Sequence, residues 1–186
     1  MAYSKHQLIA DITRFLPFNI AEKTHKSVIT ALLNSTDDCF HRHNFPAHIT
    51  GSAWVISPDS TQVLMTHHKF LDKWLQFGGH ADGEIDIKNV ALREAQEESG
   101  IMEIEYASPD IFDIDIHPIP ANPKRNEPAH YHYDIRYLLR AKIMDFAVSD
   151  ESNELKWFTL PELQALPASE AMDRMIQKWQ QIVLIN

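Results

Sequence analysis

Glycine is scarce in this chain and is concentrated in one short stretch. Of the five glycines among 186 residues, four lie between positions 78 and 100. Glycine tolerates positive φ angles and lets the backbone approach a ligand closely. Gly78, Gly79 and Gly83 precede a segment with helical spacing, and Gly100 follows it. The sequence therefore marks this stretch as the first candidate for a functional site.

The segment between these glycines carries acidic residues at helical spacing. Glu94 and Glu98 are four residues apart and Glu94 and Glu97 are three apart, so a helix projects all three carboxylates onto one arc. Like charges at this spacing cost a helix roughly 0.2–0.5 kcal/mol per pair, and Arg93 offsets part of that cost. Convergent carboxylates suit Mg²⁺ or Mn²⁺, which prefer oxygen ligands. A solvated acidic helix face is the alternative interpretation.

The stretch from Gly79 to Ile101 resembles the Nudix box, usually written G-x5-E-x7-R-E-U-x-E-E-x-G-U, where U is a bulky apolar residue. The residues that match at the expected spacing are Gly79, Arg93, Glu94, Glu97, Glu98, Gly100 and Ile101. The chain therefore resembles the Nudix hydrolases at these seven positions.

Two positions depart from the motif. Ile85 stands in the slot of the first glutamate, between Glu84 and Asp86, and Ala95 is smaller than the usual apolar residue. In the family the first glutamate generally supports the loop, and our hypothesis is that Glu84 takes that role through a shift of one residue.

The resemblance implies an α+β fold, a Nudix-like α/β/α sandwich with a mixed central sheet. It also implies hydrolysis of a nucleoside diphosphate linked to another moiety, with Mg²⁺ or Mn²⁺ as the cofactor. The implied catalytic residues are Glu94, Glu97 and Arg93, with Arg93 orienting the carboxylates. The base that takes the proton from water is left open among these glutamates and carboxylates from elsewhere, such as Asp115.

The implied metal site combines the box with a later segment. Glu94, Glu97 and Glu98 are its expected ligands from the box, and a glutamate near the end of the domain commonly joins them in the family. Glu151 and Glu154 are both candidates, and our expected metal set takes Glu151.

The segments around the box predict one compact core with an extension. Residues 3–15 and 22–33 have helix-like apolar spacing, separated by Pro17. We predict an N-terminal helical extension over 1–46 and a Nudix-like domain over 47–186. The extension packs on the core, covers the site or supports a homodimer, and packing is the interpretation we favour.

Further elements are predicted on both sides of the box. The segments 51–56 and 61–66 read as two strands joined by a turn at 57–60. The segment 151–163 resembles the strand and short helix that often close a Nudix domain. Residues 170–182 carry an apolar helical stripe, which predicts a core helix.

The two segments on either side of residues 118–129 alternate polar and apolar residues with strand periodicity. The proline-rich stretch 118–129 between them cannot continue a central strand. If the two strands pair as a hairpin, their polar faces meet in a ridge of Asp and His side chains. A sheet face that meets water is the alternative. The ridge comprises Asp113, Asp115, His117, His130, His132 and Asp134.

Histidine and aspartate are residues used for proton transfer and metal binding. We therefore expect Asp115 and His132 to bind substrate. The pair His130 and His132 could also ligate zinc or another transition metal, although such a pair without further ligands is a weak signal. His80 follows the double glycine, and we expect it and Gly79 to contact a phosphate or water, with a loop-stabilising hydrogen bond as the alternative.

Composition limits the partners of the chain. The net charge of −9 argues against a nucleic-acid backbone as the main partner, so we expect a small nucleotide-type substrate. Cys39 is the only cysteine, which excludes an intramolecular disulfide and favours a cytoplasmic location. We expect no signal peptide and no membrane span, because no apolar run approaches about 20 residues.

Two other functions compete with hydrolysis. An isomerase of isoprenoid diphosphates shares the fold but requires a cysteine, and Cys39 lies in the predicted extension before the core. A non-catalytic sensor that binds a nucleotide sugar is the other alternative. The intact glutamates of the box argue against it, as does the lack of an added basic DNA-binding region.

Overall fold

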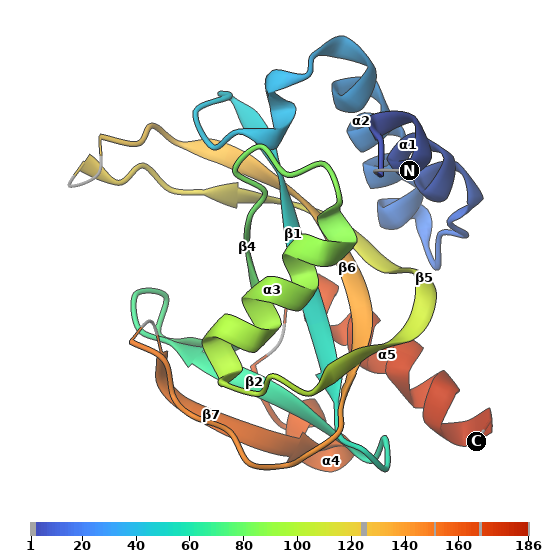
Figure 1. Cartoon of the computed structure of the whole chain (residues 1–186), viewed down its shortest axis with the longest axis vertical. Coiled ribbons are helices and arrows are strands. Elements are labelled where there is room, and N and C mark those ends of the chain that lie inside the picture. The colour runs from blue at the N-terminus through green and yellow to red at the C-terminus, as the bar shows by residue number, and fades with distance from the viewer. Residues whose placement is uncertain (1–2, 124–125, 151, 168, 186) are drawn as a thin grey trace. The chain divides into compact units, whose positions relative to one another are not determined.

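The structure is a computed structural model that describes residues 3–123, 126–150, 152–167 and 169–185 (Figure 1). In this part of the chain there are five α-helices, one 3₁₀ helix and seven strands. The helices are α1 (Lys5–Arg14), α2 (Ile20–Ser35), the 3₁₀ helix η1 (Asp38–Phe40), α3 (Ile87–Ser99), α4 (Leu160–Gln164) and α5 (Glu170–Ile185). The strands are β1 (Ala47–Ile56), β2 (Gln62–His68), β3 (Lys73–Leu75), β4 (Phe77–His80), β5 (Ile104–Ile119), β6 (His130–Ala141) and β7 (Ser152–Thr159).

The strands form one sheet in the order β3-β2-β1-β6-β5, with β4 paired to β1 and β7 paired to β2. Strand β1 is central, and all ten of its residues are buried. Strands β1 and β2 are antiparallel, and the backbone N–H of Ser60 donates to the Ser57 carbonyl at 2.9 Å in the turn between them. This hairpin agrees with the strands predicted from the sequence.

The predicted helices are present with small shifts at their ends. The segments 3–15 and 22–33 correspond to α1 and α2, and 170–182 corresponds to α5. The apolar stripe of α5 lies in the core through Met172, Met175, Ile176 and Trp179. The predicted closing strand and short helix are β7 and α4.

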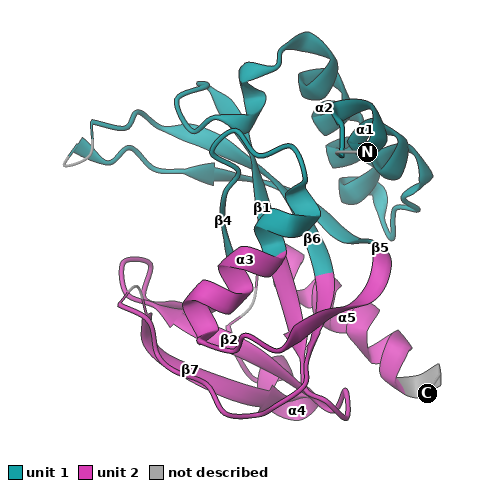
Figure 2. Ribbon diagram, in the orientation of Figure 1, with its two compact units in different colours: residues 1–52, 78–91, 110–137 teal, residues 53–77, 92–109, 138–186 magenta. Residues whose placement is uncertain are grey.

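The chain divides into two compact units (Figure 2). Unit 1 comprises residues 1–52, 78–91 and 110–137, and unit 2 comprises residues 53–77, 92–109 and 138–186. The predicted boundary between 46 and 47 follows a different criterion and stays a prediction.

In unit 1 the N-terminal helices are tied to the rest of the unit by a buried carboxylate. Glu22 of α2 is fully buried and accepts hydrogen bonds from the backbone N–H of Phe18 at 2.6 Å and of Ile114 at 3.3 Å. A buried carboxylate needs such donors because it loses its hydration. The second of these bonds joins α2 to β5 within unit 1.

Strand β1 has two different faces because side chains alternate along a strand. His48, Thr50 and Ser52 lie on one face within unit 1, and Gly51 lies on the other. A Cβ atom at Gly51 would lie 2.9 Å from the Ile87 carbonyl oxygen and 3.0 Å from a Val90 methyl group. Glycine therefore lets the start of α3 approach β1 closely.

Candidate functional site

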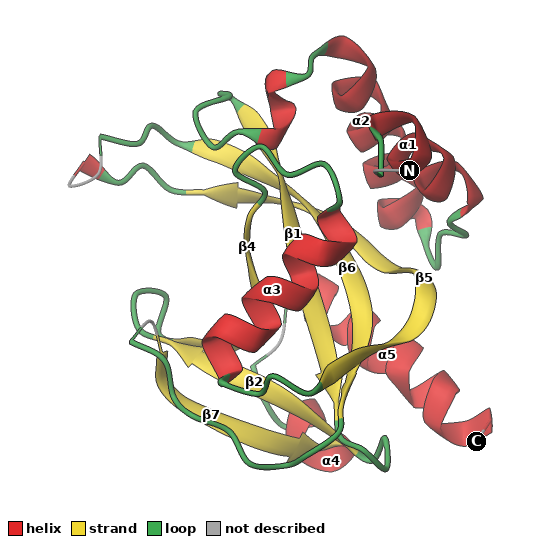
Figure 3. Cartoon of the chain, in the orientation of Figure 1, coloured by secondary structure: helices red, strands yellow, loops and turns green. Residues whose placement is uncertain are grey.

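The box glutamates lie on α3, which follows strand β4 and a short loop (Figure 3). Arg93 donates from Nη1 to Oε1 of Glu94 at 2.8 Å and to Oε2 of Glu97 at 3.3 Å. The side chain of Glu97 is 60% exposed, and that of Glu94 is 16% exposed. One guanidinium therefore orients two carboxylates that differ in their access to water. Glu98 is half-buried on the same helix.

Glycines shape both ends of this segment. Gly83 has a φ of +93° in the loop before α3, and Gly100 has a φ of +70° directly after it. The backbone N–H of Gly100 donates to the Gln96 carbonyl at 2.9 Å. The left-handed conformation at Gly100 ends the helix in the manner typical of glycine. Gly79 lies in β4 and is half-buried.

The irregular part of the motif is braced by a side chain. Oε1 of Glu84 accepts a hydrogen bond from Nδ2 of Asn89 at 2.6 Å, while Ile85 is half-buried. Asp86 Oδ1 accepts the backbone N–H of Asn89 at 3.3 Å. Both carboxylates thus contact the first turn of α3. Glu84 thus contacts the helix that follows the loop, and its role as the loop-supporting glutamate stays a prediction.

The two candidates for the later glutamate differ in what can be said of them. Glu151 lies outside the described residues. Glu154 lies in β7, is exposed and pairs in register with His67 of β2. The pairing of β2 with β7 shifts between His67 and His68, which indicates a β-bulge at this point.

The polar face of β5 and β6 is buried in unit 1. Arg136 is almost fully buried and donates to Asp134 at 2.7 Å, to Asp113 at 3.0 Å and to Asp115 at 3.2 Å. Asp134 also accepts hydrogen bonds from Thr50 Oγ1 at 2.9 Å and Ser52 Oγ at 2.7 Å. We call the following six residues the ion-pair network: Thr50, Ser52, Asp113, Asp115, Asp134 and Arg136.

The ion-pair network corrects two sequence interpretations. The alternative of a face that meets water is wrong for Asp113, Asp115 and Asp134, since all three are buried. The cross-strand partner of the β5 carboxylates is Arg136 rather than an imidazole. His117 contacts Asp115 at 3.2 Å, but both lie on β5. Burial lowers the pKa of Arg136, but the nearby Asp134, Asp113 and Asp115 outweigh it and raise the pKa well above its usual value.

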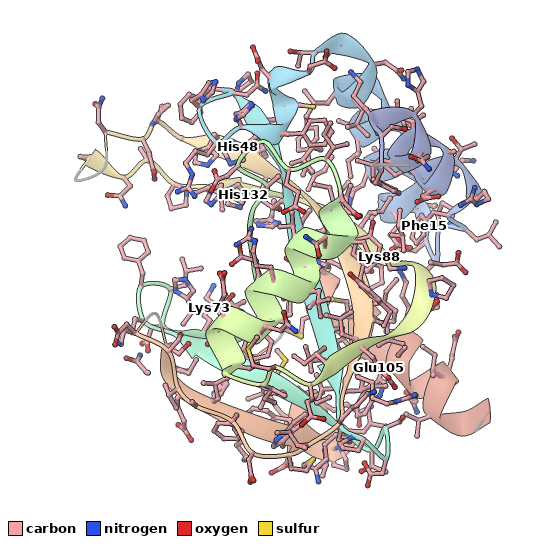
Figure 4. The ribbon with its side chains drawn as sticks, in the orientation of Figure 1. Phe15, His48, Lys73, Lys88, Glu105 and His132 are labelled. Atoms are coloured by element: carbon pink, nitrogen blue, oxygen red, sulfur yellow. The ribbon has the colours of Figure 1, made fainter. Side chains whose placement is uncertain are left out.

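Four histidines of unit 1 form a second polar group, here called the histidine cluster: His48, His80, His130 and His132. Figure 4 labels two of them, His48 and His132. The ring of His48 lies 4.9 Å from the rings of both His130 and His132, and 5.1 Å from that of His80. These residues come from β1, β4 and β6. The β6 pair was predicted as part of a ridge, whereas His48 was not singled out.

Three rings of the histidine cluster, those of His48, His80 and His132, resist protonation. Burial lowers the pKa of His80 to about 4, and the positive charge of Arg42 acts in the same direction. Burial also lowers the pKa of His132 to about 2. Burial also lowers the pKa of His48 to about 4, against a hydrogen bond to Asn44 that acts in the opposite direction. These three rings are therefore neutral near pH 7.

Sequence reasoning missed His48, Thr50, Ser52 and Arg136 as polar residues of these two groups. The signal was present, because His48, Thr50 and Ser52 alternate with apolar or small residues from Ala47 onward. The predicted strand began at 51 and excluded most of them. The three carboxylate partners of Arg136 come from two strands that only the fold aligns.

Cys39 lies in η1 and is fully buried, and its thiol contacts the Thr36 carbonyl at 3.3 Å. Burial raises the pKa of this thiol to about 11. The thiolate form that reacts as a nucleophile is therefore disfavoured.

None of the helices in the described part of the chain has the length and the apolar character that a membrane-spanning helix needs.

The chain is similar to a known protein family and to a named relative. The NUDIX domain family matches residues 47–179. A probable DHNTP pyrophosphohydrolase of Lactococcus lactis subsp. cremoris is 28% identical over 160 residues, which cover 86% of this chain and 90% of that protein.

Solved structures share the fold at lower identity. An Ap4A hydrolase of C. elegans superposes with a TM-score of 0.59 at 16% identity, over 74% of this chain and 98% of that one. The E. coli dihydroneopterin triphosphate pyrophosphohydrolase gives a TM-score of 0.52 at 17% identity, over 74% and 96%.

The predicted α+β fold, a mixed central sheet with flanking helices, is confirmed by these structures. The predicted class, a Nudix-type hydrolase that acts on phosphoric anhydrides, is confirmed by the family match together with these relatives. Because the match extends over well over half of the sequence, the chain belongs to the NUDIX domain family.

Proposed function

We propose that this protein cleaves a diphosphate linkage in a small nucleotide-type substrate, with Mg²⁺ or Mn²⁺ held by Glu94, Glu97 and Glu98. The observation that carries the proposal is the acidic arc of α3, in which Arg93 orients Glu94 and Glu97 at 2.8 and 3.3 Å. The described carboxylates fit a hard divalent cation because they offer several oxygen atoms from one rigid helix. Glu97 is largely exposed, so such an ion could keep the waters that Mg²⁺ retains.

The protein's own groups have distinct roles in this proposal. When bound, the metal ion neutralises phosphate oxygens and lowers the pKa of a coordinated water. Arg93 holds Glu94 and Glu97 in place for it. One glutamate of the arc, or a carboxylate from elsewhere such as Glu154, accepts the proton of the attacking water. Positioning and charge neutralisation supply most of the catalysis in phosphoryl transfer, so no covalent residue is needed.

The substrate class follows from the chemistry and from the relatives. The Lactococcus and E. coli proteins are named for the pyrophosphohydrolysis of DHNTP, and the C. elegans protein for Ap4A. We therefore place dihydroneopterin triphosphate and dinucleoside polyphosphates first in a substrate panel, followed by nucleotide sugars, ADP-ribose, NADH, CoA and nucleoside triphosphates.

The proposed substrate contacts are Gly79, His80, Asp115 and His132. Asp115 is already bound to Arg136 and is nearly buried. Gly79 and His80 are half-buried beside the loop that leads into α3 and are the first to test. The same proposal includes four further properties: a domain boundary between residues 46 and 47, a homodimer, a cytoplasmic location and Glu151 as a metal ligand.

The test uses Glu97→Gln, which removes one charge and keeps the shape of the side chain. We expect metal-dependent turnover of one panel member by the native protein, and a kcat lower by about 10²-fold or more in the variant. Glu103→Gln is the matched control, because Glu103 is exposed and lies outside the helix. Equal turnover by Glu97→Gln and the native protein would contradict the role of the arc.

The same variant separates the enzyme from its two rivals. A sensor would bind a panel ligand without turnover and would bind it equally well after Glu97→Gln. The isomerase alternative requires a reactive cysteine, and the burial and raised pKa of Cys39 disfavour it. Turnover that survives Cys39→Ala would remove that alternative.

A further inference from the structure

The histidine cluster contains an unsatisfied nitrogen. His48 is fully buried, and its Nε2 has no hydrogen-bond partner among the described residues. A buried polar atom without a partner costs about 1–3 kcal/mol, so it calls for an explanation such as a bound ion. One ligand atom from each of His48, His130 and His132 lies within 4.8 Å of the others.

Backbone carbonyls determine which ring nitrogen of His48 and of His130 carries the hydrogen. Nδ1 of His130 lies 2.8 Å from the Pro128 carbonyl oxygen, and Nδ1 of His48 lies 3.4 Å from that of Asn44. A carbonyl only accepts, so each Nδ1 carries the hydrogen and each Nε2 presents a lone pair. Metal-binding histidines are oriented in this way, with one ring nitrogen donating to a carbonyl and the other facing the ion.

The spacing of two of the nitrogens, those of His130 and His132, agrees with a tetrahedral ion. Zn²⁺ binds imidazole nitrogen at about 2.0–2.1 Å, which places two ligand nitrogens roughly 3.3 Å apart in a tetrahedron. Nε2 of His130 and Nε2 of His132 are 3.3 Å apart. Without an ion, one of them must donate to the other, and Nε2 of His48 has no partner among the described residues. An ion between the three would satisfy all of them.

We propose that His48, His130 and His132 bind one Zn²⁺ ion through their Nε2 atoms. The three imidazoles are neutral donors of the kind that zinc and similar first-row ions prefer, whereas the glutamate arc of α3 offers only oxygen. Three protein ligands leave a fourth position for water or for an oxygen of a bound molecule. The site differs from the proposed Mg²⁺ site in donor chemistry, and it does not depend on the proposed activity.

The first experiment titrates the full-length protein, freed of metal by a chelator, with Co²⁺ and with Zn²⁺. Excess Mg²⁺ is present to occupy the carboxylates. We expect one equivalent of Co²⁺ to produce the visible absorption of a tetrahedral site, and one equivalent of Zn²⁺ to abolish it. The variant His132→Ala should weaken binding by at least 10- to 100-fold.

Three controls make the result specific. Glu97→Gln should bind Co²⁺ as the native protein does, because its carboxylate belongs to the other site. His43→Ala tests the stacked pair His41 and His43, which is the nearest rival imidazole group in sequence. His6→Ala removes an exposed histidine of α1. Both histidine controls should keep the site.

The proposal fails if the native protein shows no stoichiometric Co²⁺ or Zn²⁺ binding, if His132→Ala binds like the native protein, or if His43→Ala abolishes binding. If His132→Ala does not fold, ¹⁵N-histidine NMR of the native protein decides the question. One equivalent of Zn²⁺ should then shift three Nε2 resonances, and their persistence unchanged would overturn the site.

Discussion

The acidic arc of α3, formed by Glu94, Glu97 and Glu98, and the ion-pair network of β5 and β6 both contain carboxylates that contact an arginine. The two sets differ in their exposure to water. On α3, Arg93 is 38% exposed and bonds to two glutamates that keep contact with water. In the network, Arg136 is 4% exposed and meets three aspartates that are removed from water. Water weakens the first set of interactions and leaves the second almost unscreened. The comparison shows that similar arginine–carboxylate contacts lie partly in water on α3 and are buried in the network.

The largest expected effect is on stability and comes from Arg136→Met. Removing this cation leaves three buried carboxylates without their partner, so we expect the free energy of unfolding to fall by about 3–5 kcal/mol. Urea denaturation followed by circular dichroism measures it. The matched variant Arg93→Met removes an exposed arginine and should cost about 0–1 kcal/mol. Similar losses in the two variants would remove the distinction between the two regions.

The next effect concerns a donor of the ion-pair network. A Cβ atom at Gly78 would lie 2.1 Å from Oγ of Ser52, the hydroxyl that donates to Asp134. Gly78→Ala should therefore lower the free energy of unfolding by about 1–3 kcal/mol through overpacking. In the background of Ser52→Gly the same change should cost less, because the obstructing side chain is gone. Additive losses in this double-mutant cycle would show that Ser52 is not the cause.

A smaller effect follows from the neutral histidines. His48 has a pKa near 4 in the folded protein, below the value of about 6.5 expected for the unfolded chain. Between these values the unfolded chain binds a proton that the folded protein does not, so stability falls as the pH drops from about 6.5 to 4. The slope is at most about 1.4 kcal/mol per pH unit for each such ring.

Thermal melts with a chelator present measure this dependence. The variant His48→Gln should flatten the slope between pH 6.5 and 4, and His6→Gln should leave it unchanged. A slope as steep in His48→Gln as in the native protein would assign the dependence to other groups.

The smallest effect on stability is expected for Glu97→Gln. Its side chain is 60% exposed, so we expect the free energy of unfolding to change by no more than about 0.5 kcal/mol. The same change is expected to lower kcat strongly, as proposed above. A large loss of stability would mean that the arc of α3 also has an architectural role.

The sequence predicted most of the local structure. The periodicity of α1, α2, α3 and α5 was sufficient to place these helices, and the spacing of the Nudix box placed Glu94, Glu97 and Glu98 on one of them. These features are local, because each depends on residues three or four positions apart.

The ion-pair network and the histidine cluster could not be predicted in the same way. Alternation in the segment that became β6 indicated two faces, but burial of its polar face depends on strands far apart in the chain. Arg136 meets Asp113 and Asp115 across 23 and 21 residues, and Thr50 meets Asp134 across 84. Such contacts require the order of strands in the sheet, which no local pattern contains.

Strand β1 alternates His48, Thr50 and Ser52 with Ile49 and Gly51, and its hydroxyls bond to Asp134 of the neighbouring strand β6. If β1 slipped by one residue, Ile49 and Gly51 would replace these hydroxyls, and Asp134 would lose two donors inside the protein. The misaligned pairing of β1 with β6 would thus be disfavoured by the unsatisfied hydrogen-bond acceptors of Asp134. The buried polar residues of β1 therefore favour one register of β1 against β6 when the sheet assembles.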